Sequence, residues 1–324
     1  MTHPRERSAP IRRLSFNANR RAVLKSLVAV LVPLYVSGCS SEDKSAEFEE
    51  AISNLELKSG GRLGVCVLGS LVGKPIGHRL NERFGMCSTF KLALAALILK
   101  ESQEGRVDLE SPVHYSQEDM VLHSPVTSMH LERGHMTVAE LAEAAQKTSD
   151  NLAANLLLDL IGGPKGFTDK LREIGDTTTR LDRYEPEMNF VPVGEVRDTT
   201  TPLAMAATVR MLLAGALLSK ENKQLIRTWM EETRTGLSRL RAGFPRNWRA
   251  GDKTGTGIAD GMPNKYNDIA VVWPDDETSI LVVTAYYDAD GTYDEVRDKD
   301  VAVLKSVGQI VADALHTQEK RRSR

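Results

Sequence analysis

The sequence has few cysteines, no large excess of one charge and no uninterrupted apolar run as long as a membrane span needs. Three cysteines among 324 residues exclude a small scaffold built on disulfides. A formal net charge of −2 leaves no basic excess for binding nucleic acid, so we expect no nucleic-acid partner. No group of His, Cys, Asp and Glu residues has zinc-ligand spacing. We therefore expect no metal and no other cofactor.

The composition is that of an ordinary globular protein, with 41% hydrophobic and 27% charged residues. It excludes a largely disordered or collagen-like chain. We find no internal repeat and no low-complexity linker. The length is enough for one large domain or two closely joined ones with a substantial core, and we expect a monomer.

The first 38 residues are predicted to be an export signal rather than part of the fold. They hold seven basic residues and one acidic residue, and an apolar run from Leu27 to Val36 follows the basic part. This run is too short for a bilayer, which needs about 20 apolar residues, but it suits the core of a secretory signal. The pair Arg20-Arg21 and its neighbours resemble a twin-arginine signal, which exports proteins that fold before they cross the membrane.

The end of this segment, Val36-Ser37-Gly38-Cys39, resembles a bacterial lipoprotein box, in which Cys39 carries a lipid and becomes the mature N-terminus. The alternative is ordinary cleavage near Gly38 without a lipid. In both cases we expect the mature domain, residues 39–324, in the periplasm or cell envelope. Membrane association is expected only through the signal or through a lipid on Cys39.

Apolar periodicity and turn residues predict the elements of the mature domain. Helices are expected over residues 46–58, 88–100, 137–145, 151–160, 202–218 and 298–315. Strands are expected over residues 63–68, 269–273 and 279–287, the last two as a hairpin.

Strands therefore lie at both ends of the domain, with helices between them. This order predicts an α+β fold, in which one antiparallel sheet is built from both termini and flanked by helices. We expect an α/β lobe of about residues 45–80 and 235–316, and an inserted all-helical lobe of about residues 81–234. The cleft between two such lobes is the natural place for a binding site.

Ser88 and Lys91 are the first candidate catalytic residues. Ser88 begins the apolar helix, and Lys91 follows three residues later on the same helix face. A lysine in a dry site can lose its proton near neutral pH and act as a base for the hydroxyl. Free N–H groups at the start of a helix can bind an oxyanion. The alternative, an N-cap serine and a surface lysine, fits poorly with a helix that is apolar nearly all round.

Two further motifs favour catalysis. Ser149-Asp150-Asn151 and Lys253-Thr254-Gly255 follow Ser88 in the order that is the signature of penicillin-recognising serine enzymes. Each motif alone also fits an ordinary turn or strand end. Together the three point to acyl transfer.

The chemistry of acyl transfer gives the second motif two roles. Ser149 can relay a proton to the leaving amide nitrogen, assisted by the charge of Lys253. The side-chain amide of Asn151 can hold the amide carbonyl of the substrate and orient Lys91.

The third motif is assigned to substrate binding. Lys253 and Thr254 can bind the carboxylate that β-lactams and D-Ala-D-Ala peptides both carry. Gly255 and Thr256 complete this binding segment, and the backbone N–H groups of Ser88 and Thr256 would frame the reacting carbonyl oxygen.

The segment from Arg180 to Asn189 resembles the active-site loop of the class A serine β-lactamases, and the resemblance extends over nearly the whole mature chain. In that family a glutamate and an asparagine four residues later hold the water that hydrolyses the acyl-enzyme, and Glu185 and Asn189 occupy these positions. The resemblance implies hydrolysis of the β-lactam amide of penicillins and cephalosporins through Ser88, and hence antibiotic resistance. Whether Lys91 or Glu185 accepts the proton during acylation is disputed for the family.

Two other functions stay open at this point. A D,D-peptidase acting on peptidoglycan shares the three motifs, but such enzymes lack the glutamate base and stay acylated by penicillins. A non-catalytic β-lactam sensor is less favoured, because no transmembrane helix or signalling domain is attached.

The resemblance also implies roles outside the motifs. Arg183 and Asp198 fall where the family ties the two ends of the loop together with an ion pair. Arg239 lies where some relatives place an arginine that supports the carboxylate site; a structural ion pair is the alternative.

His123 stands where many relatives have an aromatic residue at the cleft edge, and it receives no catalytic role. Some relatives join the cysteine before the nucleophile to the residue that is Gly257 here, so that disulfide cannot form. Cys66 could pair with Cys87 only if the geometry permits, and we expect two buried thiols.

Overall fold

The computed structural model describes residues 41–69, 72–273 and 280–322, so the predicted export signal and Cys39 lie outside the described residues. A five-stranded antiparallel sheet has the strand order β2-β1-β9-β8-β7. Its strands are β1 Arg62–Gly69, β2 Ile76–His78, β7 Arg249–Gly257, β8 Lys265–Trp273 and β9 Leu281–Asp288. Because β1 pairs with β9 along its whole length, both ends of the domain contribute to one sheet, as predicted.

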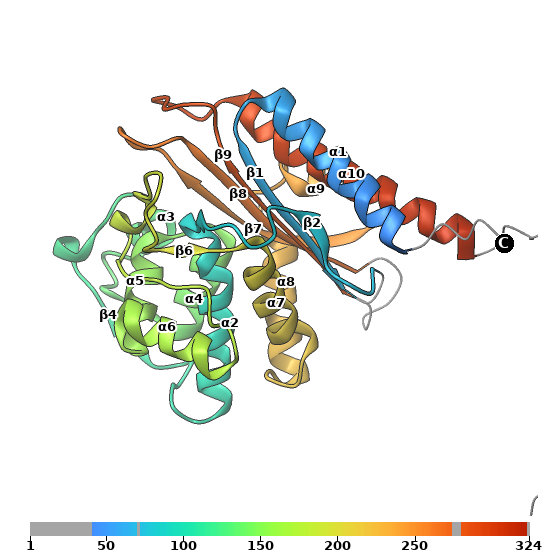
Figure 1. Ribbon diagram of the computed structural model, residues 1–324. Helices are drawn as coiled ribbons and strands as arrows, with labels where there is room; N and C mark the ends of the chain where they lie inside the picture. The colour runs from blue at the N-terminus through green and yellow to red at the C-terminus, as the bar shows by residue number, and fades with distance from the viewer. Residues whose placement is uncertain (1–40, 70–71, 274–279, 323–324) are drawn as a thin grey trace, which may run out of the picture. The chain divides into compact units, whose positions relative to one another are not determined.

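Helices cover both faces of this sheet (Figure 1). On one face α1, Ser41–Ser59, packs beside α10, Asp298–Arg322, with the short α9, Leu240–Gly243, next to them. The other helices are α2 Phe90–Gln103, α3 Pro125–Met129, α4 Val138–Lys147, α5 Asn151–Leu160, α6 Gly163–Glu173, α7 Pro202–Ala214 and α8 Lys220–Glu232. Within the described residues, no helix combines the length and the apolar character needed to cross a bilayer.

Short elements connect these parts. Two-stranded ladders join β3 Phe84–Gly85 to β6 Thr199–Thr200, and β4 Pro112–His114 to β5 His135–Thr137. Single 3₁₀ turns are η1 Cys87–Thr89, η2 Gln117–Asp119 and η3 Glu187–Asn189. Both η1 and η3 carry residues of the predicted site.

The sheet is buried on both faces by the helices that cover it. Successive side chains of a strand point to opposite sides, so each strand contributes to both cores. In β1, Val65 packs with Ile52 of α1 and Leu304 of α10 in one core. The next residue, Cys66, belongs to the second core, which also contains the residues of α2. The predicted α+β fold class is therefore confirmed.

Helix α2 lies in the middle of the second core. All ten residues from Phe90 to Leu99 are buried, including Lys91. A helix with this composition has no polar face to turn to water, so it is stable only when surrounded by other elements. The candidate nucleophile Ser88 lies immediately before this buried helix.

Three details of the expected elements are wrong or incomplete. The predicted helix 202–218 ends at Ala214, because the chain leaves the helical conformation at Gly215. The segment after the predicted helix 151–160 begins a further helix, α6, with Gly162 in the left-handed region at φ 90° and Pro164 in the first turn. Helix α8 and strand β7 were not predicted.

Candidate active site

A cleft of about 320 Å³ lies where β7 faces the helices. Its lining residues are Ser88, His123, Ser149, Asn151, Asn189, Thr235, Arg239, Thr254, Gly255 and Thr256. The remaining predicted site residues, Lys91, Glu185 and Lys253, are almost completely buried. They lie within hydrogen-bond distance of Ser88 or Ser149, as described below, so all predicted catalytic residues come together.

Ser88 lies in η1, immediately before α2. The side chain of Asn267 on β8 donates to the carbonyl oxygens of Gly85 and Met86, at 2.8 and 3.0 Å, and so fixes the segment before the serine. On the other side β7 approaches so closely that a Cβ at Gly255 would lie 2.8 Å from the Met86 oxygen and 3.2 Å from the Ser88 nitrogen. Only glycine permits this contact of strand and nucleophile.

Lys91 has no exposed side-chain surface and donates to three acceptors. They are Glu185 Oε1 at 2.9 Å, the Ser149 carbonyl at 2.8 Å and Asn151 Oδ1 at 2.5 Å. Three acceptors match the three N–H groups of an ammonium. Burial lowers the pKa of Lys91, and the neighbouring carboxylate of Glu185 acts in the opposite direction.

Ser88 and Lys91 meet through Glu185 rather than directly. The hydroxyl of Ser88 donates to Glu185 Oε1 at 3.1 Å, and the same oxygen accepts from Lys91. The other carboxylate oxygen, Oε2, accepts from the Nδ2 of Asn189 at 2.5 Å. One carboxylate therefore connects Ser88, Lys91 and Asn189.

The backbone of Glu185 is held by Asn155 of α5, a residue the sequence analysis missed. Asn155 accepts from the Glu185 nitrogen at 3.0 Å and donates to its carbonyl at 2.8 Å. The available signal was the i, i+4 spacing of Asn151 and Asn155, which puts both amides on one face of a mostly apolar helix.

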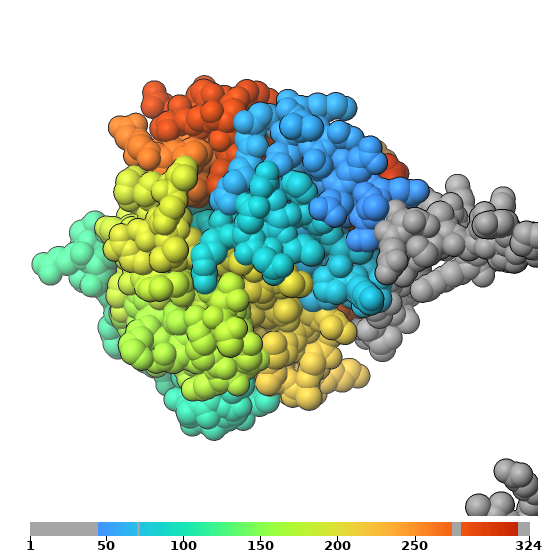
Figure 2. Space-filling view, in the orientation of Figure 1, coloured from blue at the N-terminus to red at the C-terminus, as the bar shows by residue number. Residues whose placement is uncertain are grey.

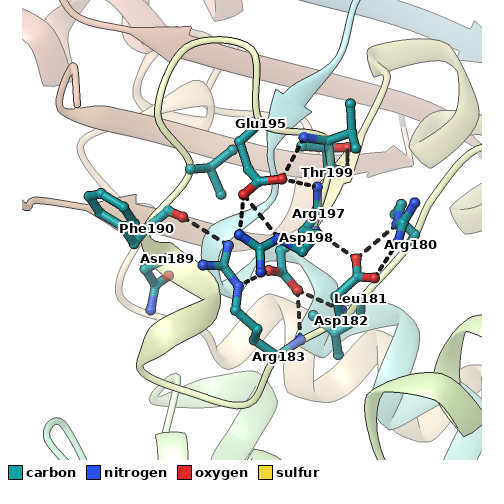
Figure 3. Close-up of polar contacts among 12 residues, drawn as sticks. Arg180, Leu181, Asp182, Arg183, Asn189, Phe190, Glu195, Arg197, Asp198 and Thr199 are labelled. Atoms are coloured by element: carbon teal, nitrogen blue, oxygen red, sulfur yellow. Dashed lines mark hydrogen bonds and ion pairs between the residues drawn. The ribbon is translucent and has the colours of Figure 1, made fainter. Parts of the chain in front are cut away.

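The loop that carries Glu185 is fixed at its base by the predicted ion pair, which Figure 3 shows. Arg183 Nε lies 2.5 Å from Asp198 Oδ2, and Asp198 has no exposed side-chain surface. Asp198 Oδ1 also accepts from the backbone nitrogens of Asp182 and Arg183, at 2.7 and 3.0 Å. Burial raises the pKa of Asp198, whereas these backbone donors and the Arg183 guanidinium lower it and so stabilise the buried carboxylate.

Ser149 and Lys253 form the second half of the site. Lys253 Nζ donates to Ser149 Oγ at 3.0 Å and to the Thr254 carbonyl at 2.9 Å. Burial and the nearby charge of Lys91 hold the pKa of Lys253 well below its usual range. Ser149 has φ 62°, and this left-handed turn lets its carbonyl face Lys91 while its hydroxyl faces Lys253.

Asp150 anchors this turn without touching the cleft. Its carboxylate accepts from the nitrogens of Val126 and Thr127, both at 2.9 Å, and from Ala153 at the start of α5. The residue therefore caps the helix that presents Asn151, whose own side chain donates to the Leu122 carbonyl at 2.8 Å.

Arg239 is buried against strand β7. It donates to the carbonyls of Gly255 and Asn267, at 2.8 and 2.6 Å, and to Thr256 Oγ1 at 2.6 Å. These partners make it a support for β7 and β8 as well as a lining residue of the cleft. Thr235, also missed from sequence, accepts from Thr254 Oγ1 at 2.8 Å.

Comparison of the chain with known protein families identifies its family. Residues 47–315 match the model of the family described as the beta-lactamase enzyme family. The chain belongs to this family. Its expected membership of class A is confirmed by solved structures of class A β-lactamases, one of which is 48% identical to this chain over the aligned residues.

Among its relatives, this β-lactamase is 38% identical to beta-lactamase OXY-2 of Klebsiella oxytoca, over 90% of this chain and 97% of the relative. It is 41% identical to beta-lactamase L2 of Stenotrophomonas maltophilia, over 91% and 95% of the two chains. The class A β-lactamase of the last common ancestor of Gram-negative bacteria superposes with a TM-score of 0.78 at 48% identity, over 83% and 99%. A β-lactamase from Xanthomonas campestris gives 0.77 at 45% identity, over 84% and 98%.

The two thiols of this β-lactamase in the described residues are free and buried, as predicted. Burial raises the pKa of both Cys66 and Cys87 to about 12, so neither competes with Ser88 as a nucleophile. His123, at the cleft edge, has φ 61° and its Nε2 lies 3.1 Å from the Thr148 carbonyl. Among the residues that the structure covers, no cluster of three or more His, Cys, Asp and Glu side chains is arranged to bind a metal.

Proposed function

We propose that this serine β-lactamase opens penicillins and cephalosporins through an ester on Ser88 and that Glu185 directs both halves of the reaction. The observation that carries the proposal is the position of Glu185 Oε1, 3.1 Å from the Ser88 hydroxyl and 2.9 Å from Lys91 Nζ. A buried carboxylate already hydrogen-bonded to the nucleophile is placed to accept its proton.

In acylation, Ser88 Oγ attacks the β-lactam carbonyl carbon while its proton moves to Glu185. The developing oxyanion lies between the backbone N–H groups of Ser88 and Thr256, which the close approach of β7 brings together. Lys91 stays an ammonium with three acceptors in the resting site, and its charge stabilises the negative charge that forms.

When the amide C–N bond breaks, the nitrogen must receive a proton. Ser149 Oγ is the nearest hydroxyl on the Lys253 side, and it accepts from that ammonium at 3.0 Å. Ser149 then donates its own proton to the nitrogen and takes one from the Lys253 ammonium. The proton that Glu185 accepted from Ser88 passes on to Lys253, so that Glu185 is a carboxylate again before deacylation begins. The lowered pKa of Lys253 favours such a transfer.

The substrate carboxylate is assigned to the end of the cleft where Thr254, Thr235 and Lys253 lie. Thr254 and Thr235 are joined by a hydrogen bond of 2.8 Å, and Thr254 has cleft-facing surface. Arg239 adds positive charge beneath this segment and fixes the Thr256 hydroxyl. Asn151 Nδ2, across the cleft, is assigned to the amide carbonyl of the substrate.

Deacylation needs a water activated against the Ser88 ester. Glu185 Oε2 and the amide of Asn189 lie side by side at 2.5 Å. Asn189 Oδ1 is buried and accepts no hydrogen bond from the described residues, so it is available to a water that Glu185 deprotonates. This pair favours hydrolysis over the D,D-peptidase alternative, whose acyl-enzyme with penicillin persists.

The test is the number of turnovers. Purified protein should hydrolyse a chromogenic cephalosporin many times per molecule, whereas a D,D-peptidase would stop after one equivalent. Ser88→Ala should abolish both turnover and covalent labelling by penicillin while leaving the circular dichroism spectrum unchanged. Labelling that persisted in Ser88→Ala would remove this residue from the role of nucleophile.

We further propose that residues 1–38 are removed on export and that the mature enzyme works as a monomer in the periplasm or cell envelope. Replacing Arg20 and Arg21 by lysine should leave the enzyme in the cytoplasm, since the twin-arginine pathway reads that pair. Cys39→Ser should release it from membranes if a lipid anchors it; protein that is already soluble before this change would contradict the anchor. Sedimentation of the purified enzyme tests the monomer.

A further inference from the structure

The connection between β7 and β8, residues 258–264, reaches the loop of Glu185 through a buried methionine. Ile258, Asp260 and Gly261 are exposed, whereas Met262 retains only 1% of its surface. In Figure 2 the orange surface of this connection lies against the yellow surface of the loop around residue 190. A buried apolar side chain in an otherwise exposed connection indicates that the connection packs against a neighbouring segment through this residue.

Met262 contacts the Glu185 loop and strand β7 at once. Its Sδ accepts the backbone N–H of Val191 at 3.3 Å. Its methyl carbon lies 3.3 Å from the place where a Cβ on Gly257 would be, and the Asn189 carbonyl and Cys87 Sγ surround the same place at 3.2 and 2.9 Å. Met262 therefore fills the space between the end of β7 and the residues that follow η3.

The other side of the connection is hydrogen-bonded to the segment that follows β9. The Met262 carbonyl accepts from Thr292 Oγ1 at 2.7 Å. Asn264, which is fully buried, donates its amide to the Tyr293 carbonyl at 2.8 Å, and its backbone carbonyl accepts from Ala289 at 2.8 Å. Met262 is thus held by Thr292 on one side and contacts Val191 on the other.

The loop needs such a contact on this side. Asn155 holds Glu185 from the α5 side, and the pair of Arg183 and Asp198 fixes the base of the loop. Asn189, which orients the Glu185 carboxylate, lies two residues before Val191. A shift of Val191 away from β7 would therefore move Asn189 relative to Ser88.

We propose that Met262 is a positioning residue for deacylation: it holds Val191, and through it Asn189, at the distance from Ser88 that the hydrolytic water requires. The inference rests on the proposed role of Glu185 and Asn189. Within the described residues Met262 does not line the cleft, and Asn189 contacts Oε2 of Glu185 whereas Ser88 donates to Oε1, so the contact between Ser88 and its base does not pass through Met262. Loss of the contact slows the second half-reaction and spares the first.

The test compares Met262→Ala with the parent by steady-state kinetics and by intact-protein mass spectrometry during turnover of a penicillin. For Met262→Ala we expect kcat to fall on the order of 10–10²-fold, the scale of a small misplacement of catalytic groups. We expect kcat/KM to stay within about threefold because acylation is intact, so KM falls with kcat and the acyl-enzyme accumulates. Met262→Leu, which refills the space, should show a much smaller defect.

Met205→Ala is the matched control, because Met205 is also fully buried but lies in α7, within the second core. It should lower thermal stability without accumulation of acyl-enzyme. If Met262→Ala does not fold, Met262→Val removes the same sulfur and methyl with a smaller loss of stability, and we expect the same kinetic pattern from it. Equal losses of kcat and kcat/KM, unchanged kcat, or the same pattern in Met205→Ala would each overturn the inference.

Glu185→Gln distinguishes a failure of the proposed function from a failure of this inference. If Glu185→Gln stalls as acyl-enzyme while Met262→Ala turns over normally, only the role of Met262 fails.

Discussion

Glu185 and Lys91 form an ion pair of 2.9 Å in which neither side chain is exposed to solvent. Such a pair stabilises both charges only while both partners are present, because a single buried charge is costly. The carboxylate raises the pKa of Lys91 against the larger lowering effect of burial. Any change at Glu185 is thus also a change in the proton affinity of Lys91.

Glu185→Gln should separate the two half-reactions. The amide keeps the shape of the side chain but cannot take a proton from water, so turnover should fall about 10²–10⁴-fold. Without the carboxylate the pKa of Lys91 falls further, so its neutral amine is present at lower pH and can accept the Ser88 proton. Intact-protein mass spectrometry should show a stable penicillin adduct whose formation rate rises with pH to a plateau. Parent-like turnover would remove Glu185 from the role of base.

Asn155→Ala should weaken deacylation through the backbone. The substitution removes both hydrogen bonds that fix the Glu185 peptide and leaves that peptide without its partners. We expect a loss of about 1–3 kcal/mol in the free energy of unfolding and accumulation of acyl-enzyme during turnover. Urea denaturation and mass spectrometry measure the two effects. A stability loss with unchanged kcat would show that the loop holds Glu185 without Asn155.

Arg183→Ala should destabilise the protein strongly, because it leaves Asp198 buried without its guanidinium. Removing one partner of a buried pair typically costs about 3–5 kcal/mol in the free energy of unfolding. Arg197→Ala is the matched control, since Arg197 pairs with Glu195 but is half-exposed, and such pairs contribute about 0–1 kcal/mol. Equal losses in the two variants would contradict the anchoring role of Arg183.

Glu101 should make stability depend on pH. Hydrogen bonds from Arg106, with a further contribution from Lys170, lower the pKa of this buried carboxylate from 4.5 to about 2. An acid with a lowered folded-state pKa stabilises the fold above its unfolded pKa, and this stabilisation is lost as pH falls from about 4.5 to 2. Screening around the half-exposed Arg106 reduces the effect to about 1–2 kcal/mol.

Glu101→Gln should therefore be less stable than the parent at pH 7 by this amount, and the difference should close as pH falls through that range. Thermal unfolding at several pH values measures it. The exposed Glu110→Gln provides the control and should show no such convergence. A difference that stayed constant with pH would mean that the charge of Glu101 is not what stabilises the fold.

The sequence was sufficient to predict which residues lie together where their proximity depends on local spacing. Glu185 and Asn189 are separated by four residues, and their side chains meet directly. Ser88 and Lys91 are one helical turn apart and so lie near the same point, although Glu185 is what connects them. The apolar composition of α2 likewise predicted its burial. These features follow from the geometry of a short stretch of chain.

Residues whose role depends on packing between distant segments could not be predicted in this way. Strand β7 is rich in glycine and charged residues, which have low strand propensity, yet it is a strand because it pairs with β8 over nine residues. Thr235 and Asn155 act through partners far along the chain. Nothing in their immediate neighbours indicates those partners.

The pairing of β1 with β9 has a consequence for how the chain folds. Arg62 lies opposite Asp288 and Gly69 opposite Leu281, so the inner strands of the sheet come from segments more than 200 residues apart. Closing a contact of that length has a large entropic cost and slows folding. β1 cannot enter the sheet until β9 has been synthesised. The sheet is therefore completed only after residue 288 has been synthesised, and until then β1 lacks its partner on that side. An export route that accepts only finished proteins suits a chain of this topology.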